Sequence, residues 1–451
     1  MKKQRIRIST TQIILLSFLV VIFMGTVLLA LPISSADGKP VPILDALFTA
    51  TTSTCVTGLV VVPTVSSWSL FGQVVILLLI QIGGLGVITI MSGLMILLHR
   101  KMNIGDRLLL QDAFNLNSLS GLVRFVKRVL LGTLVIEGTG ALLYMTVFVP
   151  EFGAKGIWIS LFNSVSAFCN AGIDIIAENS LCSYALNPIV NAVTCALIIL
   201  GGIGYIVWWD VLRVIKLAKK KKVKFFRDLT LHSKIALSTT LVLIVAGAVL
   251  IFAFEYNNPL TMRDCTFFQK AELSLFQSVT TRTAGFNTVD LSSITHSSMF
   301  IMILLMLVGG SPGSTAGGMK TTTFAVLISS VISTFKHRKT AEMFGRRLED
   351  NVTRLATCAV TLYVFFAGGA AVVISTLDNI PFINALFESA SAIATVGLTT
   401  GITTQLGTIS SVLLTLLMLF GRVGSLTMLF AFSNYKSKPQ SQKPLEKIQI
   451  G

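Results

Sequence analysis

Long apolar stretches alternate with shorter, more polar stretches along this chain. Eight of the apolar runs are long enough to cross a membrane as helices. This pattern predicts an all-α polytopic membrane protein with eight transmembrane helices. The runs lie at residues 12–32, 70–98, 129–149, 188–212, 232–254, 298–334, 352–376 and 409–432.

The eight runs form four successive pairs. Between the two runs of each pair lies one amphipathic segment that ends in a glycine. Each segment covers about ten residues, or about 15 Å of helix, which is half the thickness of the hydrocarbon core. Such a segment must enter the membrane and return on the same side. Its phenylalanine recurs at spacings of 114, 114 and 111 residues, which indicates a fourfold internal repeat. The phenylalanines are Phe48, Phe162, Phe276 and Phe387.

The repeat predicts four tandem helix–pore loop–helix units. Non-helical backbone at this depth is stable only where it lines water or is buried in protein. The glycine permits a positive φ, so that successive carbonyls can face a polar hole and replace the hydration shell of a monovalent cation. We therefore expect a pseudo-fourfold arrangement around one pore. The expected units are residues 1–110, 111–220, 221–340 with a broken helix, and 341–435, followed by a tail at 436–451.

Composition and charge support this interpretation. The chain is 53% hydrophobic and only 12% charged, which excludes a soluble enzyme with a single core. The net charge of +16 comes mainly from the N-terminus, the three long connections and the tail, which hold 29 of the 36 lysines and arginines. The positive-inside rule places both termini in the cytoplasm. The basic run at 216–222 is then a topology and lipid-headgroup signal, or alternatively a docking site for an acidic partner.

A cluster of small residues lies in the second apolar run of each unit, at 82–86, 200–204, 308–313 and 420–424. Helix packing is the simpler explanation of the first two clusters. The third cluster begins the sequence GGSPGSTAGGMK, which must break the helix because Pro312 removes a backbone donor and the glycines disfavour helix. The broken segment is either a static kink or, as we favour, a mobile loop that can block ions.

Ionisable residues inside the membrane are costly and usually face a cavity. Arg422 lies level with the broken loop, where it is either a positive barrier to cations or a structural tie. We expect Lys320 to extend to the cytoplasmic face, and Arg282 to anchor its segment. Glu388 is expected to begin the fourth segment and to complement its positive end. Glu137 belongs to an outer helix and has no partner that the sequence identifies.

The turns VTG, NAG, TAG and TVG and the break GGSPGSTAGG together resemble the Trk/Ktr/HKT superfamily of potassium transporters over essentially the whole chain. The chain is most similar to the KtrB or KtrD membrane subunit of bacterial Ktr systems. The resemblance implies one potassium selectivity filter, because in that family four filter glycines go with potassium preference. The implied ion-binding residues are Val56, Thr57, Gly58, Asn170, Ala171, Gly172, Thr283, Ala284, Gly285, Thr395, Val396 and Gly397.

The same resemblance implies an intramembrane gating loop with Arg422 as its partner. It also implies homodimers in the bacterial plasma membrane, docked on a cytosolic ring of nucleotide-binding regulatory subunits of the KtrA/KtrC type. No cofactor and no nucleic acid are expected; the transported ion is potassium, with sodium as a candidate stimulating ion. The implied gate residues are Gly309, Gly310, Ser311, Pro312, Gly313, Ser314, Thr315, Ala316, Gly317, Gly318, Lys320 and Arg422.

The expected function is potassium uptake through a channel-like pore. A sodium-coupled carrier with alternating access is the first alternative, because it can be built from the same parts. A membrane-embedded enzyme or scaffold is the second. We predict no enzyme, because the sequence offers no acid/base pair, nucleophile constellation or metal cluster.

Overall fold

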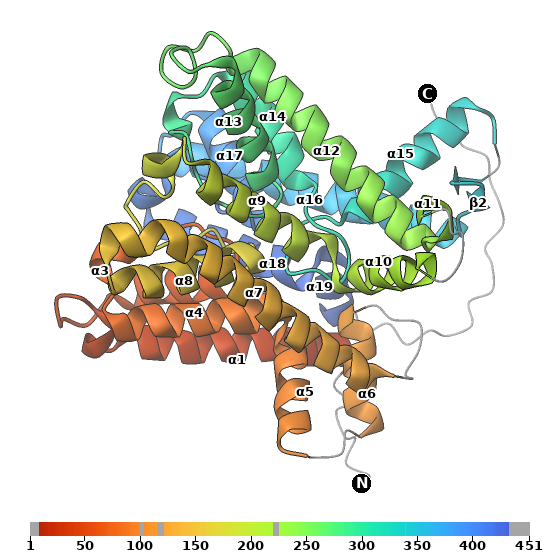
Figure 1. Cartoon of the computed structure of the whole chain (residues 1–451), viewed down its shortest axis with the longest axis horizontal. Helices are drawn as coiled ribbons and strands as arrows, with labels where there is room; N and C mark the ends of the chain where they lie inside the picture. Colours follow the sequence, from red (N-terminus) through yellow and green to blue (C-terminus); the bar gives the residue numbers. More distant parts are fainter. Residues whose placement is uncertain (1–8, 100–102, 115–120, 220–224, 339, 433–451) are drawn as a thin grey trace.

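The computed structural model describes residues 9–99, 103–114, 121–219, 225–338 and 340–432. The chain is mostly helical, as expected for the predicted fold class (Figure 1). Within the described residues, four helices are long and apolar enough to cross a membrane, or six if each of two bent pairs is one span. The tail at 436–451, the first basic residues and the end of the basic run at 216–222 lie outside the described residues.

The four long helices contribute much of the exposed apolar surface. Phe23 and Phe365, on the first and the last of these helices, are 69% and 71% exposed. Apolar surface of this extent is typical of a surface that lipid covers. Polar side chains cap two of these helices, at Ser9 and Thr230: Ser9 and Gln12 form a capping box, and Thr230 accepts from the backbone of Ser233. The long helices are α1 (Thr10–Ala30), α7 (Leu122–Phe152), α12 (Leu231–Glu255) and α16 (Asp350–Leu377).

A short helix follows each long helix and packs against it. The short helices have 13 to 15 residues, so each is only about 20 Å long and cannot cross a hydrocarbon core of about 30 Å. The phenylalanine of each repeat lies in one of them, and all four phenylalanines are buried. The short helices are α2 (Ile43–Cys55), α8 (Lys155–Cys169), α13 (Phe267–Thr280) and α17 (Phe382–Ala394).

The apolar run after each short helix is interrupted. Over 70–98 and 188–212 the chain is helical, but each run bends by 97° at a glycine with φ of 88° or 100°, which the sequence did not predict (Figure 1). The run at 409–432 is interrupted at Gly424, which has the same backbone conformation. The helices are α4 (Leu70–Leu85) and α5 (Val87–Leu97), α9 (Pro188–Ile203) and α10 (Tyr205–Ala218), and α18 (Thr408–Val423) and α19 (Ser425–Phe432).

The third of these runs is broken most completely, as the sequence predicts. Helix α14 (His296–Leu307) ends before the glycine-rich segment, and α15 (Thr321–Phe335) begins after it. Residues 308–320, between these two helices, form an irregular loop. This loop is called the broken loop below.

The helices form four groups, and each group consists of a long helix, the short helix after it and the interrupted run that follows. Contacts between these groups close into a ring. Helix α4 packs on α8, α9 on α13, α14 on α17, and α18 on α2. In each group, the first helix of the interrupted run therefore packs against the short helix of the next group. The fourth group packs in this way against the first. This order brings the C-terminal ends of the four short helices together.

Small elements connect the groups. Helix α6 (Ile104–Phe114) follows α5, and the strands β1 (Glu342–Met343) and β2 (Arg346–Arg347) form an antiparallel hairpin after α15. The remaining short elements are α3 (Thr64–Ser67), α11 (Phe225–Asp228) and 3-10 turns at Pro32–Ser34, Cys182–Tyr184, Leu291–Ser293 and Thr403–Gln405.

Candidate functional site

Each short helix leads directly into one of the four turns that the sequence singled out. The first residue of each turn has a left-handed backbone, with φ between 52° and 62°, and the glycine two residues later has φ between 62° and 97°. Left-handed backbone is a genuine outlier for β-branched residues, and such strain concentrates at functional sites. We expected positive φ only at the glycines. The residues with left-handed backbone are Val56, Asn170, Thr283 and Thr395.

The four turns meet in a closed cycle. A Cβ built on Gly58 would lie 2.5 Å from the carbonyl oxygen of Ala171, and one built on Gly172 would lie 2.4 Å from that of Ala284. A Cβ built on Gly285 would lie 2.5 Å from the carbonyl oxygen of Val396. The cycle closes because a Cβ on Gly397 would lie 2.2 Å from the carbonyl oxygen of Thr57. Each of these positions must therefore be a glycine, because any side chain would collide with the carbonyl oxygen of the next turn.

Four buried hydroxyl groups hold the turns in this conformation. Each lies four residues after the repeat phenylalanine, a periodic signal in the sequence that we did not use. Thr52 and Ser391 accept hydrogen bonds of 3.0 Å from the backbone N–H of Gly58 and Gly397. In the other two turns, the hydroxyl donates to the carbonyl after the glycine: Ser166 to Ile173 at 2.5 Å and Thr280 to Phe286 at 2.7 Å. The third turn is one residue shorter, and the missing residue lies between Thr280 and Gly285.

Two adjacent threonines provide a test of this bracing. Thr52→Val leaves the N–H of Gly58 buried without an acceptor, which should destabilise the protein by about 1–3 kcal/mol. Thr51 is equally buried, but its hydroxyl has no hydrogen-bond partner among the described residues, so Thr51→Val should cost almost nothing. Thermal unfolding of the two variants in detergent measures the difference. Equal losses of stability would show that the Thr52 hydroxyl does not brace the turn.

The broken loop lies against the second turn. The backbone N–H of Ser311 and of Thr315 donate to the carbonyls of Gly202 and Gly201, at 2.9 and 3.2 Å. The hydroxyl of Thr315 reaches the turn itself: it donates to the side-chain oxygen of Asn170, at 3.1 Å, or to the carbonyl of Phe168, at 3.0 Å. The loop therefore contacts the C-terminal end of helix α8.

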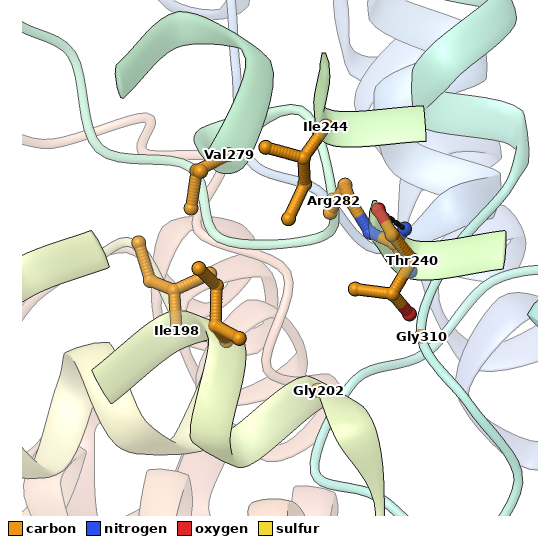
Figure 2. A pocket seen from close by; sticks show the side chains of 8 residues that line it. Ile198, Gly202, Thr240, Ile244, Val279, Arg282 and Gly310 are labelled. Carbon is orange, nitrogen blue, oxygen red and sulfur yellow. Dashed lines mark hydrogen bonds between the residues drawn. The ribbon is translucent and has the colours of Figure 1, made fainter. Parts of the chain in front are cut away.

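The same loop also contacts the third and fourth turns. A Cβ built on Gly317 would lie 2.0 Å from the hydroxyl oxygen of Thr395, so the loop backbone touches the fourth turn. Arg282, in the third turn, donates to the carbonyl of Gly309 at 2.9 Å. Figure 2 shows the Arg282 side chain beside Thr240 and Gly310, at the edge of a cavity of about 10 Å³. Arg282 thus ties its turn to the loop, which extends the anchoring role that we expected.

Arg422 connects the broken loop to a different group of helices. Its guanidinium donates to the carbonyl of Thr315 in the loop and to the carbonyls of Gly83 and Gly84 at the end of α4, the last at 2.9 Å. Its side chain lies on α18, so one residue joins three of the four groups. The planar guanidinium, with five donors, is suited to several carbonyls at once.

Lys320 and Glu388 differ from the sequence-based expectations, and Glu137 has an interhelical partner that the sequence left unnamed. Lys320 does not extend away from the loop: its ammonium donates to the carbonyls of Ala316 and Gly317, at 2.9 and 3.5 Å. Glu388 does not begin its helix, because α17 starts at Phe382; it is fully buried and accepts hydrogen bonds from threonine hydroxyls. Glu137 has a partner that the sequence did not identify, the side-chain amide of Gln81 at 3.1 Å.

Comparisons with known proteins agree with this geometry. A family model described as TrkH, cation transport protein, matches residues 2–443. The chain is 38% identical to the potassium/sodium uptake protein NtpJ of Enterococcus hirae, covering all of this chain and 99% of that protein. It is also 38% identical to Ktr system potassium uptake protein B of Bacillus subtilis, over 95% and 94% of the two chains.

The fold has a solved counterpart. The crystal structure of the potassium transporter TrkH from Vibrio parahaemolyticus superposes with a TM-score of 0.75 at 15% identity, covering 96% of this chain and 86% of that one. The resemblance to the Trk/Ktr/HKT superfamily, inferred from the four turns and the broken loop, is confirmed. The chain is a membrane protein that belongs to the TrkH family of cation transport proteins.

Proposed function

We propose that this chain is the ion-translocating subunit of a Ktr-type system that takes up potassium across the bacterial plasma membrane. The observation that carries the proposal is the closed cycle of contacts from Gly58 through Gly172 and Gly285 to Gly397. Relatives named as potassium or potassium/sodium uptake proteins support the choice of ion.

The cycle of turns acts as the selectivity filter. Carbonyl oxygens of the four turns replace the water around a potassium ion that enters the axis. The four short helices end at this cycle, so the partial negative charge of each C-terminus also favours a cation there. The left-handed backbone at the first residue of each turn aims the following carbonyls away from the helix ladder. A site built from backbone dipoles holds the ion without a fixed full charge and therefore also releases it.

The broken loop, residues 308–320, acts as the gate. It lies directly against three of the four turns. Its amides donate hydrogen bonds to the surrounding helices, and its carbonyls accept hydrogen bonds from arginine side chains. Arg422 and Lys320 add positive charge on this side of the turns, and positive charge in a pore opposes cation passage. Opening requires the loop to leave Arg422, whose hydrogen bonds to Thr315, Gly83 and Gly84 hold the closed arrangement.

The charge distribution and the names of the relatives support a proposal for the surrounding assembly. The four units surround one pore in a pseudo-fourfold arrangement, with eight membrane-crossing segments and both termini in the cytoplasm. The name of the Bacillus subtilis relative places it in a Ktr system, which supports a separate regulatory component for this chain. We propose a homodimer that docks on a cytosolic ring of nucleotide-binding subunits.

Rubidium flux into liposomes that contain the purified protein tests the proposed function. We expect uptake that potassium inhibits and that continues when sodium is omitted from both sides, because a carbonyl filter needs no second ion. The name of the Enterococcus hirae relative includes sodium, so a sodium-coupled carrier is the second candidate. Uptake that stops without sodium, with a fixed ratio between the two ions, would establish the carrier instead. Liposomes that take up no rubidium would contradict both candidates.

A further inference from the structure

An open pocket lies between the N-terminal end of α7 and helix α10. Its volume is about 370 Å³, within the range of roughly 300–1,000 Å³ that is usual for small-molecule sites. The proposed filter and gate do not use it. The lining residues are Gly121, Arg124, Phe125, Arg128, Ile206 and Trp209.

The pocket gathers hydrogen-bond donors and positive charge without an anion. Arg124 and Arg128 are four residues apart and therefore project from the same face of α7. In the described part of the chain, no carboxylate lies within 4.0 Å of either guanidinium. The Arg128 guanidinium lies 5.5 Å from the centre of the Trp209 ring, so cation and indole share this pocket.

The start of α7 offers further donors. Its N-cap is Gly121, which provides no side chain to accept hydrogen bonds from the first helical turn. The amides of that turn are oriented toward the N-terminal end, where the helix dipole favours an anion. Two guanidinium groups and a helix N-terminus thus point to the same kind of ligand, one with several acceptor oxygens and negative charge.

The position of the pocket along α7 indicates where this ligand comes from. The helix has 31 residues, or about 46 Å, so about ten residues extend beyond a hydrocarbon core of about 30 Å. Exposed apolar side chains begin one turn after Arg128, with Leu131 at 63% and Leu134 at 64% exposed. The change from exposed arginine to exposed leucine marks the membrane boundary. The pocket therefore lies at the level of the lipid headgroups, on the side where basic residues are concentrated.

We propose that this pocket binds the phosphate group of an anionic phospholipid. Guanidinium groups bind phosphate through paired, charge-assisted hydrogen bonds, and Arg124 and Arg128 both line the pocket. Free inorganic phosphate shares this chemistry. The lipid is favoured because the acyl chains of a lipid held here would continue along the exposed leucines of α7, whereas free phosphate gains nothing from them. Such a lipid joins α7 to α10, two helices of the second group.

Native mass spectrometry of the full-length protein, titrated with phosphatidylglycerol in a neutral detergent, tests the proposal. The double variant Arg124→Gln/Arg128→Gln should retain about tenfold less lipid, the effect of losing one or more charge-assisted hydrogen bonds. Lys127→Gln is the matched control, because Lys127 lies in the same turn and is exposed but does not line the pocket. It should leave retention unchanged. Equal losses in both variants would mean that surface charge alone attracts the lipid, and would overturn the proposal.

Two further arms distinguish the sources of the phosphate and guard against misfolding. Inorganic phosphate, added at a large excess over the lipid, should not displace phosphatidylglycerol. Displacement would identify a site for the free anion and overturn the lipid assignment. If the double variant does not fold, Arg124→Lys alone decides, because lysine keeps the positive charge but lacks the paired donors of the guanidinium, and it should lower retention by about threefold. Unchanged retention in Arg124→Lys would then contradict the site.

Discussion

Replacing Gly285 by serine is expected to abolish most of the discrimination between potassium and sodium. The backbone of Gly285 has φ of 83°, which a serine adopts only under strain. A Cβ there would lie 2.5 Å from the carbonyl oxygen of Val396, so this carbonyl must move away from its position in the cycle. A shift of one carbonyl would enlarge or distort the proposed filter ring, whose carbonyls replace the water around potassium, the larger of the two ions. We expect the ratio of rubidium to sodium uptake to fall at least about tenfold, which corresponds to ~1.4 kcal/mol of differential binding.

Gly401→Ser is the matched control for this variant. Gly401 has almost the same φ, 88°, and lies four residues after the glycine of the fourth turn, but a Cβ there would meet nothing within 4 Å. The backbone strain is therefore similar, while the crowding of a carbonyl is absent. Competition between rubidium and sodium in liposomes should change only in Gly285→Ser. Unchanged selectivity in Gly285→Ser, with normal protein insertion, would exclude this turn from the ion path.

Arg422→Ala is expected to raise the resting potassium flux by about tenfold. The substitution removes the donors that hold Thr315 of the broken loop to Gly83 and Gly84 of the first group. Loss of even one such bond to a charged group, about 1.5–3 kcal/mol, shifts a two-state loop toward its open arrangement by tenfold or more. The positive charge that opposes cations disappears at the same time. Both changes act in the same direction.

Arg422→Lys separates these two effects. Lysine keeps the charge, but its ammonium cannot span the carbonyls of the broken loop and of α4 as the guanidinium does. If the hydrogen bonds hold the gate, the lysine variant should conduct nearly as well as the alanine variant. If the charge alone is the barrier, the lysine variant should stay near the native rate. A native rate in both variants would contradict the gating role of Arg422.

The sequence predicted the helical membrane fold and the position of the helix break because these features have strong local signals. Apolar runs and a cluster of glycines around Pro312 depend only on neighbouring residues, and the repeat is visible in the sequence because its spacing is nearly constant. The family was also recognised from the turns and the break, and the comparisons confirm it. The filter and gate assignments remain proposals, which the variants above are designed to test.

The features that the sequence did not reveal depend on contacts between distant residues. Val56 and Thr395 have left-handed backbone although β-branched residues disfavour it, because the packed short helices and neighbouring turns impose this conformation. Gly86 and Gly204 were read as helix-packing residues, but their positive φ allows 97° bends. The partner of Glu137 was missed because Gln81 lies 56 residues away in sequence.

The central claim is that the carbonyl groups of four converging turns bind a dehydrated potassium ion. Cryo-electron microscopy or anomalous diffraction of the protein in rubidium, compared with the protein in lithium, tests this claim directly. We predict rubidium density on the axis of the cycle, within coordination distance of the carbonyls of Thr57, Ala171, Ala284 and Val396, and no such density in lithium. Rubidium density elsewhere, with none on this axis, would contradict the account.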